Sequence, residues 1–283
     1  MHDEPMDMPT PAIPSALTPA QAARAFLTPR PSAVPVPLQL PDATALRLPT
    51  AEVDLAALAA GRGPTVLLVH GWEGQASDLQ AIADALLTRG FRVVALDLPA
   101  HGASGGRRTS IPASARALLQ AAPALGPLHA VVAHSVGSAV AVTAMARGLA
   151  VGRAVMLAAP AFYADHAHAF ARQLGLDAAA TTQMIERLRD EGVDVDAIAA
   201  PALVRGLRQP ALYVHSADDR VIPIADARAA CAAWPGARLW RVDGLGHRRL
   251  LGDRSVVGAV ARFVAEGALP AAAAAGEALA APG

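Results

Sequence analysis

The stretch Ala133-His134-Ser135-Val136-Gly137 decides how this chain is expected to fold. The apolar run 128–133 predicts a buried strand that ends here, and the following run, rich in Ala, Val and Met, predicts a buried helix. A serine at such a junction, flanked two positions away by small residues, is typical of a nucleophile elbow. The turn is so tight that a bulky side chain at either flanking position would strike the adjoining strand or helix. Gly137 meets this demand fully, and Ala133 departs from the more usual glycine by one methyl group.

The composition indicates a single globular α/β domain. The chain has 283 residues, of which 53% are hydrophobic and 17% charged. Such a length can bury one large core, and such a composition excludes an intrinsically disordered protein. Basic and acidic residues number 24 each, so nothing indicates a nucleic acid or an anionic membrane as a partner. Cys231 is the single cysteine, which excludes an internal disulfide bond.

The sequence favours a cytoplasmic location. The N-terminal residues include acids and prolines, and they lack the basic region followed by an apolar region that a secretory signal needs. His, Ser or Gly interrupts the most apolar windows before they reach the length of a membrane span. We therefore expect a protein that does not enter a membrane. The sequence leaves the oligomeric state open.

Runs typical of strands alternate with runs typical of helices through most of the chain. This alternation predicts an α/β fold with a mostly parallel central sheet and helices on both faces, preceded by one antiparallel strand pair. The strands are expected at residues 44–48, 52–58, 65–69, 92–96, 129–134, 153–158, 211–215 and 238–242. The main helices are expected at residues 112–122, 136–147, 177–191, 225–233 and 254–265.

Two stretches match the capping box that begins many helices. Thr18-Pro19-Ala20-Gln21 predicts a short helix to about Leu27. Ser77-Asp78-Leu79-Gln80 predicts a helix whose apolar residues recur at helical spacing until Gly90 ends it.

The alternation stops at Pro160 and resumes at Ala211. The intervening residues hold two or three helical patterns and no convincing strand, which predicts a helical insertion that forms a lid above the sheet. The expected organisation therefore has four parts. These are a partly disordered N-terminal extension (1–35), the α/β core (36–160 and 209–267), the lid (161–208) and a disordered alanine-rich tail (268–283).

Five motifs lie where expected strands end. They are His70-Gly71-Trp72-Glu73-Gly74, Asp97-Leu98-Pro99-Ala100-His101-Gly102-Ala103-Ser104, the elbow, Asp218-Asp219-Arg220-Val221-Ile222-Pro223 and Gly244-Leu245-Gly246-His247. In this order they resemble the motifs of the α/β-hydrolase superfamily, over about residues 44–265, although Ala100 stands where the family has glycine. The chain is similar to a bacterial subgroup with His-Gly-Trp-Glu-Gly and Gly-Leu-Gly-His-Arg-Arg motifs, a similarity that implies no particular substrate.

Ser135, Asp219 and His247 are the expected catalytic residues. A serine hydroxyl needs a base within hydrogen-bond reach, a histidine can accept and return a proton near neutral pH, and a carboxylate orients the imidazole. Each candidate follows an expected strand, so all three should meet at one edge of the sheet, in the chain order of the fold. Asp219 stands four residues before Pro223, which favours it as the acid, while Asp218 remains the alternative.

The resemblance implies a serine hydrolase, similar to carboxylesterases, that cleaves an ester or related acyl bond through an acyl-enzyme. It also implies an oxyanion hole formed by the backbone N–H groups of Trp72 and Val136. His70, Phe162 and Tyr163 are expected at the substrate pocket, and the aromatic residues indicate a small-molecule substrate with an apolar acyl group. For His70 the alternative is a structural role, in which it bonds the loop backbone and shapes the oxyanion pocket. No cofactor motif is present, and this mechanism needs none.

Other functions stay open. The same triad can perform acyl transfer, thioester hydrolysis or cleavage of a C–C bond, and a catalytically silent member of the fold would serve for binding alone. His166 and His168 lie two residues apart on an expected helix and so do not share a face. Without a third ligand they are expected at the lid surface and not in a metal site.

Several charged or polar residues near the motifs are expected in structural roles. Asp97 and His101 should stabilise their loop, His134 should pack beneath the elbow, and His215 should be an interior residue at a strand end.

Three further charged residues lie close to the expected site. Glu73 is expected in solvent, where it could repel anionic substrates. Arg248 and Arg249 are expected in solvent or in salt bridges, with binding of a substrate carboxylate as the alternative.

Overall fold

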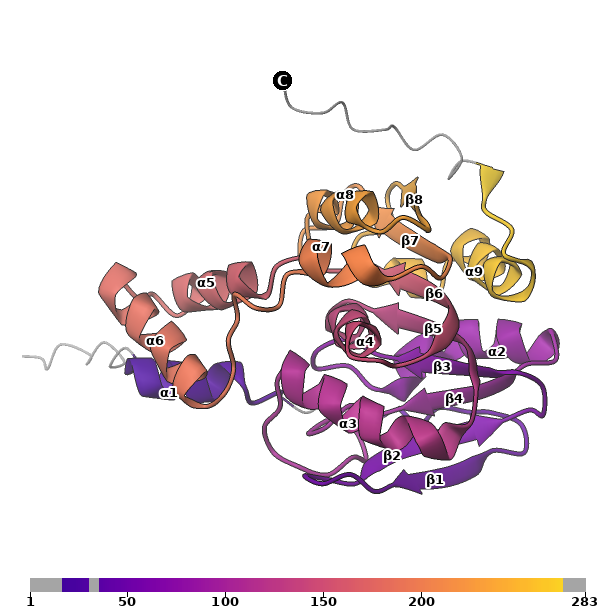
Figure 1. Ribbon diagram of the computed structural model, residues 1–283, viewed down its shortest axis with the longest axis horizontal. Coiled ribbons are helices and arrows are strands. Elements are labelled where there is room, and N and C mark those ends of the chain that lie inside the picture. The colour runs from indigo at the N-terminus through magenta and orange to yellow at the C-terminus, as the bar shows by residue number, and fades with distance from the viewer. Residues whose placement is uncertain (1–16, 31–35, 272–283) are drawn as a thin grey trace, which may run out of the picture.

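Eight strands form one sheet in residues 17–30 and 36–271, the part of the chain that this computed structural model describes (Figure 1). Their order is β1-β2-β4-β3-β5-β6-β7-β8. β2 pairs antiparallel with β1 and β4, and all other neighbours are parallel. The strands are β1 (Thr44–Leu48), β2 (Leu55–Ala60), β3 (Thr65–Val69), β4 (Arg92–Leu96), β5 (Leu128–His134), β6 (Val151–Leu157), β7 (Ala211–Ser216) and β8 (Ala237–Val242).

The disorder predicted for the extension and the tail concerns mainly residues 1–16, 31–35 and 272–283, which lie outside the described residues.

The strand predictions agree with the structure within two residues, apart from β2. This strand begins three residues late because Thr50 and Val53 close the preceding turn. The Thr50 hydroxyl donates to the Val53 carbonyl oxygen at 2.5 Å and accepts from the Val53 N–H at 3.3 Å.

Both faces of the sheet are buried. Leu67 and Val69 of β3 pack in the core on one face, and Val66 and Leu68 pack in the core on the other. This double burial explains why the sequence of β3 is continuously apolar. The predicted fold, a mostly parallel sheet between two layers of helices, is confirmed. One layer contains α2 (Gln80–Thr88) and α9 (Arg254–Glu266), and the other contains α3 (Ile111–Leu125), α4 (Val136–Ala146) and α8 (Ile224–Ala233) (Figure 1).

Of the two predicted capping boxes, the one at Thr18 is confirmed. The α-helix start predicted at Ser77 is wrong, because a short 3-10 helix (Ala76–Leu79) occupies this position and α2 begins after it. The Asp97 carboxylate accepts a hydrogen bond of 2.9 Å from the Ala76 N–H and holds this turn. The partner lies on another loop, so the local pattern cannot reveal it.

Helices fill the segment between β6 and β7, as the sequence predicts. A single isolated bridge, between Phe162 and Ala199, joins the two ends of the segment. The described helices of this insertion are α5 (Tyr163–Gln173), α6 (Ala178–Asp190) and α7 (Ala200–Leu203).

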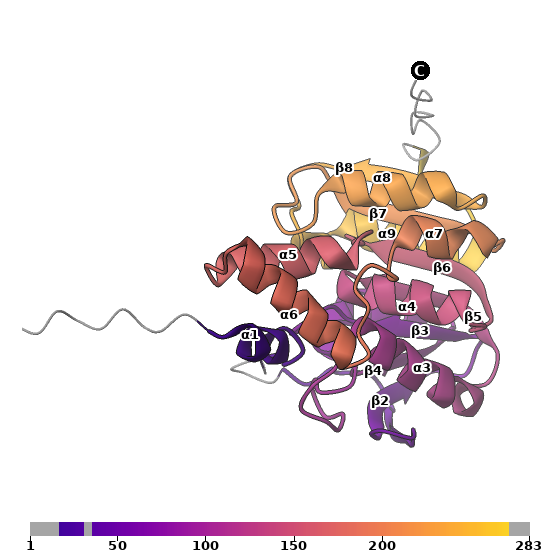
Figure 2. The same ribbon diagram turned by 60° about the vertical axis from the view of Figure 1, so that its left-hand side comes forward.

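The N-terminal helix α1 (Pro19–Phe26) packs against the insertion, beside α6 in both views (Figures 1 and 2). The ring centroid of Phe26 lies 5.3 Å from that of Tyr163 and 5.4 Å from that of Phe170. These aromatic contacts give α1 and α5 a shared apolar core. Part of the predicted extension therefore belongs structurally with the insertion.

Ser135 occupies the tip of the turn between β5 and α4. Its backbone has φ of 51° and ψ of −128°, a conformation that side-chain-bearing residues rarely adopt. The Ser135 N–H donates to the Leu157 carbonyl oxygen at 2.8 Å, which holds the turn to β6. A Cβ on Gly137 would lie 2.2 Å from the carbonyl oxygen of His70 and 2.6 Å from that of Val69. The predicted elbow is confirmed, and only glycine fits at position 137.

We expect Gly137→Ala to lower the free energy of unfolding by about 1–3 kcal/mol or more, because the added methyl group would overlap two backbone carbonyls. Gly258→Ala in α9 is the matched control, since a Cβ there meets no atom within 4 Å. This control should gain about 0.5–1 kcal/mol, the usual cost of glycine inside a helix. Urea unfolding followed by circular dichroism measures both changes. A Gly137→Ala protein as stable as wild type would contradict the close approach.

Candidate active site

Ser135, His247 and Asp219 form one hydrogen-bonded series at the carboxyl edge of the sheet. Oγ of Ser135 lies 3.0 Å from Nε2 of His247, and Nδ1 of the same ring lies 2.8 Å from Oδ2 of Asp219. The three residues follow β5, β8 and β7, so parallel strands bring together loops that are far apart in the chain. With Nδ1–H donating to the carboxylate, Nε2 is the acceptor for the serine hydroxyl proton.

The carboxylate of Asp219 is fully buried and receives several donors. Its Oδ1 accepts from the N–H groups of Val221 and Ile222, at 2.8 and 3.0 Å. Its Oδ2 faces His247 and, at 3.4 Å, Nε2 of His215. Burial raises the pKa of Asp219, but the hydrogen bonds from the two histidines and the backbone outweigh it and hold the pKa well below its usual range. Asp219 is therefore ionised at neutral pH.

Asp218, the alternative acid, binds the backbone of the histidine loop. Its Oδ1 accepts from the Ser216 hydroxyl at 2.5 Å and from the Gly246 N–H at 3.2 Å. The Ser216 Oγ in turn accepts from the N–H groups of Leu245 and Gly246, both at 3.1 Å. Asp218 and Ser216 thus fix the loop that carries His247, and the structure places Asp219, not Asp218, against the imidazole.

His215 is a contact of Asp219 that the sequence did not reveal. The side chain is fully buried, as predicted, with Nε2 at 3.0 Å from the Ile222 carbonyl oxygen and 3.4 Å from Oδ2 of Asp219. Both neighbours are acceptors, so Nε2 carries the proton. Within the described residues, Nδ1 has no hydrogen-bond partner. The one sequence signal is that His215 precedes Asp219 by four residues across a tight turn.

His134 connects the elbow to the histidine loop. Its Nε2 donates to the His247 carbonyl oxygen at 2.9 Å, and the two ring centroids lie 4.9 Å apart. Burial, and next the neighbouring His247, lower the pKa of His134 to about 3, so the ring is neutral. The predicted burial of His134 at the elbow is confirmed. The bond to the histidine loop adds a positioning role that only the structure shows.

His70 joins the loops after β3 and β4 and does not line the pocket. The side chain is completely buried, its Nδ1–H donates to the Gly71 carbonyl oxygen at 2.7 Å, and its Nε2 accepts from the Leu98 N–H at 3.0 Å. Burial is the main cause that lowers the pKa of His70 to about 3. Because both ring nitrogens bind the backbone, neither is free for a substrate. This corrects the expectation of a pocket residue and confirms the alternative, a residue that bonds the loop backbone.

Asp97 and His101 stabilise their loop, as predicted. Oδ2 of Asp97 accepts from the Ala103 N–H at 2.9 Å, and Nδ1–H of His101 donates to the Pro99 carbonyl oxygen at 2.9 Å. Nε2 of His101 also accepts from the Glu73 N–H at 3.1 Å, which joins this loop to the loop after β3. Ala100, which replaces the family's glycine, has φ of 64°, the left-handed conformation that glycine adopts without strain. The other departure, Ala133, lies inside β5 and needs no such conformation.

A family model for the Alpha/beta hydrolase family matches residues 66–262, which cover more than half of the chain and every motif described above. The chain belongs to the alpha/beta hydrolase family.

Relatives of this hydrolase include two proteins named pimeloyl-(acyl-carrier protein) methyl ester esterase. The one from Stenotrophomonas maltophilia (strain K279a) is 28% identical over 247 residues, which cover 72% of this chain and 94% of the relative. The one from Xanthomonas campestris pv. campestris (strain B100) is 29% identical over 250 residues, which cover 74% of this chain and 98% of the relative.

Solved structures with the same fold include two esterases. The esterase from Pyrococcus furiosus has a TM-score of 0.65 and 18% identity, and the match covers 84% of the hydrolase and 97% of the esterase chain. The esterase from Exiguobacterium antarcticum has a TM-score of 0.65 and 15% identity, and the match covers 79% of the hydrolase and 100% of the esterase chain. At these identities the likeness concerns the fold alone.

Two backbone N–H groups of the hydrolase, those of Trp72 and Val136, make no backbone hydrogen bond to the described residues. Val136 is the first residue of α4, where helical N–H groups lack an internal partner. A Cβ on Gly71 would lie 3.0 Å from that of Ser135, so the loop that carries Trp72 contacts the serine. Both groups are therefore available to a bound atom, and their role as an oxyanion hole stays a prediction.

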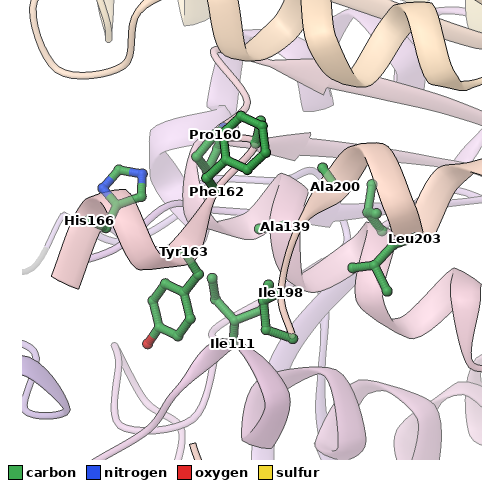
Figure 3. Close-up of a pocket in the computed structure, with 11 residues that line it drawn as sticks. Ile111, Ala139, Pro160, Phe162, Tyr163, His166, Ile198, Ala200 and Leu203 are labelled. Atoms are coloured by element: carbon green, nitrogen blue, oxygen red, sulfur yellow. The ribbon is translucent and has the colours of Figure 1, made fainter. Parts of the chain in front are cut away.

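A small cavity of about 10 Å³ lies between α4 and the insertion (Figure 3). Phe162 and Tyr163, which the sequence places at the pocket, line this cavity. His166 lines it too, so its predicted surface position is wrong, whereas His168 is exposed as predicted. Both Tyr163 and His166, three residues apart, line the cavity from α5. The remaining lining residues are Ile111, Ala139, Val142, Pro160, Ala161, Ile198, Ala200 and Leu203.

The charged residues around the site of the hydrolase make local contacts. Arg248 and Arg249 lie 3.9 Å from carboxylate oxygens of Asp78 and Asp218, which confirms the predicted salt bridges. Glu73 accepts a hydrogen bond from a backbone N–H of the N-terminal segment at 3.1 Å. In residues 17–30 and 36–271, no three His, Cys, Asp or Glu side chains are grouped to hold a metal ion. None of the helices described there has the length and apolar character needed to cross a bilayer.

The hydrolase should lose stability as the pH falls from about 7.5 to about 5. His70 and His134 are neutral in the folded state, with pKa values of about 3, but titrate near 6.5 when unfolded. The unfolded chain therefore binds more protons below about pH 6.5, and stability is lost on acidification. Each histidine contributes on the order of 2 kcal/mol at pH 5.

Urea midpoints at several pH values measure this slope. His134→Gln should reduce the slope, since one of the buried histidines whose pKa is lowered no longer titrates. His168→Gln is the control on an exposed histidine and should leave the slope unchanged. A wild-type midpoint that is the same at both ends of the range would contradict the neutral burial of these rings.

Proposed function

We propose that this alpha/beta hydrolase is a serine esterase that cleaves a small carboxylic ester through an acyl-enzyme. The observation that carries the proposal is the unbroken series from the Ser135 hydroxyl through His247 to the ionised Asp219. The esterase names of the relatives support the same reaction class.

Ser135 Oγ attacks the ester carbonyl carbon while His247 Nε2 accepts the hydroxyl proton. The tetrahedral intermediate collapses, the C–O bond to the alcohol breaks, and the imidazolium returns the proton to the leaving alkoxide. Water then enters, gives a proton to Nε2 and attacks the acyl-enzyme carbonyl. The acid leaves as Ser135 recovers its proton. Asp219 keeps its charge throughout and stabilises the imidazolium.

The N–H groups of Val136 and Trp72 are the proposed donors to the oxyanion. The first lies at the N-terminus of α4, where the helix dipole also favours negative charge. The second belongs to the loop that the Gly71 contact holds against the serine. Removal of one such donor typically costs about 100-fold or more in rate.

The insertion, residues 161–208, is proposed to act as a lid over this site. Its first residues wall the cavity, and the Asp226 carboxylate anchors its start by accepting a hydrogen bond of 2.7 Å from the Ala161 N–H. The names of the relatives make methyl esters the first substrates to test, with the acyl group either free or attached to a carrier protein.

Ser135→Ala should lower esterase activity by at least about 10⁴-fold, because it removes the nucleophile. Hydrolysis of p-nitrophenyl and methyl esters measures this loss, and a fluorophosphonate probe should label wild type but not the variant. Equal labelling of both proteins would disprove the nucleophile. Folded wild-type protein without activity on esters, thioesters or amides would favour a silent, binding role of the fold.

Asp219→Asn should lower kcat by about 10⁴-fold, because the amide no longer favours the active tautomer of His247. Asp218→Asn is the matched control one residue away. This variant keeps an acceptor oxygen for Ser216 and Gly246, so its kcat should fall by less than about tenfold. Steady-state kinetics on one ester compare the two variants, and a larger loss for Asp218→Asn would reverse the assignment of the acid.

A further inference from the structure

The cavity beside α4 begins close to the proposed nucleophile. Ala139 and Val142 lie on α4, four and seven residues after Ser135, which is the N-cap of this helix. On its opposite side the cavity is closed by the insertion, through residues such as Phe162 and Leu203 (Figure 3). The cavity therefore lies beside the helix that begins directly after the proposed nucleophile.

The size of the cavity restricts what enters it. Its volume, about 10 Å³, is the space that about one water molecule occupies. A long unbranched acyl chain does not fit under the insertion in this arrangement. One substituent of water or methyl size does fit.

His166 makes an otherwise apolar wall polar on one side. Its half-buried ring faces the cavity from α5 (Figure 3). Its titratable neighbours include Asp226 and His247, and it makes no hydrogen bond to a described residue. Oδ2 of Asp226 already accepts a hydrogen bond from the Ala161 N–H. A half-buried imidazole that faces a cavity without a partner is a group that a ligand atom can satisfy.

Burial lowers the pKa of His166, against the opposing effects of Asp226 and Asp165. The ring is therefore neutral at neutral pH, with one N–H donor and one acceptor. A hydroxyl group can accept from this donor or donate to this acceptor, and it is small enough for the cavity. A methyl group of similar size would leave the imidazole unpaired.

The acyl group is the part of the substrate that suits this cavity. After the first step the alcohol must leave for solvent, whereas the acyl group stays attached to Ser135. A small cavity closed by the insertion suits the part that remains.

We propose that this cavity receives the hydroxyl substituent of a short acyl group attached to Ser135, and that His166 hydrogen-bonds to that hydroxyl. The proposal rests on the proposed esterase function and narrows its substrates to esters of small hydroxy acids. A methyl-for-hydroxyl replacement in the acyl group should cost about tenfold in kcat/KM, since one hydrogen bond is lost and the imidazole remains unpaired.

Isosteric ester pairs test the proposal. Methyl 2-hydroxypropanoate is compared with methyl 2-methylpropanoate, and methyl 3-hydroxybutanoate with methyl 3-methylbutanoate. Each ratio of kcat/KM is divided by the ratio of the alkaline hydrolysis rates, which removes intrinsic reactivity. Wild type should prefer the hydroxy ester about tenfold in at least one pair, and His166→Leu should bring that ratio to about one.

His168→Leu is the matched control, because it makes the same change two residues away on the exposed side of α5. It should keep the wild-type ratio. His166→Gln keeps a polar group and should retain part of the preference for the hydroxy ester. This variant also tests the proposal if His166→Leu does not fold. The rate of fluorophosphonate labelling reports an intact site in every variant.

Several results would overturn the proposal. These are a wild-type enzyme without preference in either pair, a preference that His166→Leu leaves intact, or a preference only for 2-hydroxyethyl acetate over propyl acetate, which would place the hydroxyl on the alcohol side. Failure of the esterase function itself is distinct, because wild type would then cleave no ester and Ser135 would not be labelled.

Discussion

The close approach of α4 to the loop after β3 is the constraint on which the rest of the site depends. No side chain fits between Gly137 and the carbonyl oxygens of Val69 and His70, so helix and loop are held together without a gap. This packing supports the strained backbone of Ser135, a conformation that persists only when its surroundings leave no alternative. It also brings the start of α4 and the loop of Trp72 to the same hydroxyl group. Nucleophile and proposed oxyanion donors are thus positioned by one backbone contact.

Buried histidines connect loops that are distant in sequence. His70 joins the loops after β3 and β4, His134 joins the elbow to the histidine loop, and His215 reaches Asp219. A neutral imidazole suits this task because it offers one donor and one acceptor in a rigid ring. Burial depresses the pKa of His70 and His134 and so preserves their neutral form. The acid sensitivity of the fold and the alignment of the site have the same physical origin.

The insertion is supported from outside the sheet. Its helix α5 shares aromatic contacts with α1, while the Asp226 carboxylate holds its first residue. The inner face of α5 therefore has a defined position relative to α4, which leaves a cavity of about 10 Å³ with one polar wall. A motion of the insertion would change the size of this cavity without disturbing the triad loops, which the sheet positions separately.

The sequence by itself determined the strands, the elbow and the chain order of serine, acid and histidine. Each depends on local physics, namely continuous apolar runs for strands buried on both faces, and small residues where a turn is tight. The spacing to Pro223 also favoured Asp219 as the acid, and the structure confirms it. Tertiary structure alone decided where α2 begins, and that His166 faces a cavity while His70 does not. These outcomes depend on contacts between residues that are distant in sequence, such as Ala76 with Asp97, or on the direction of a side chain. Such contacts exist only after the sheet has assembled, and no local pattern encodes them.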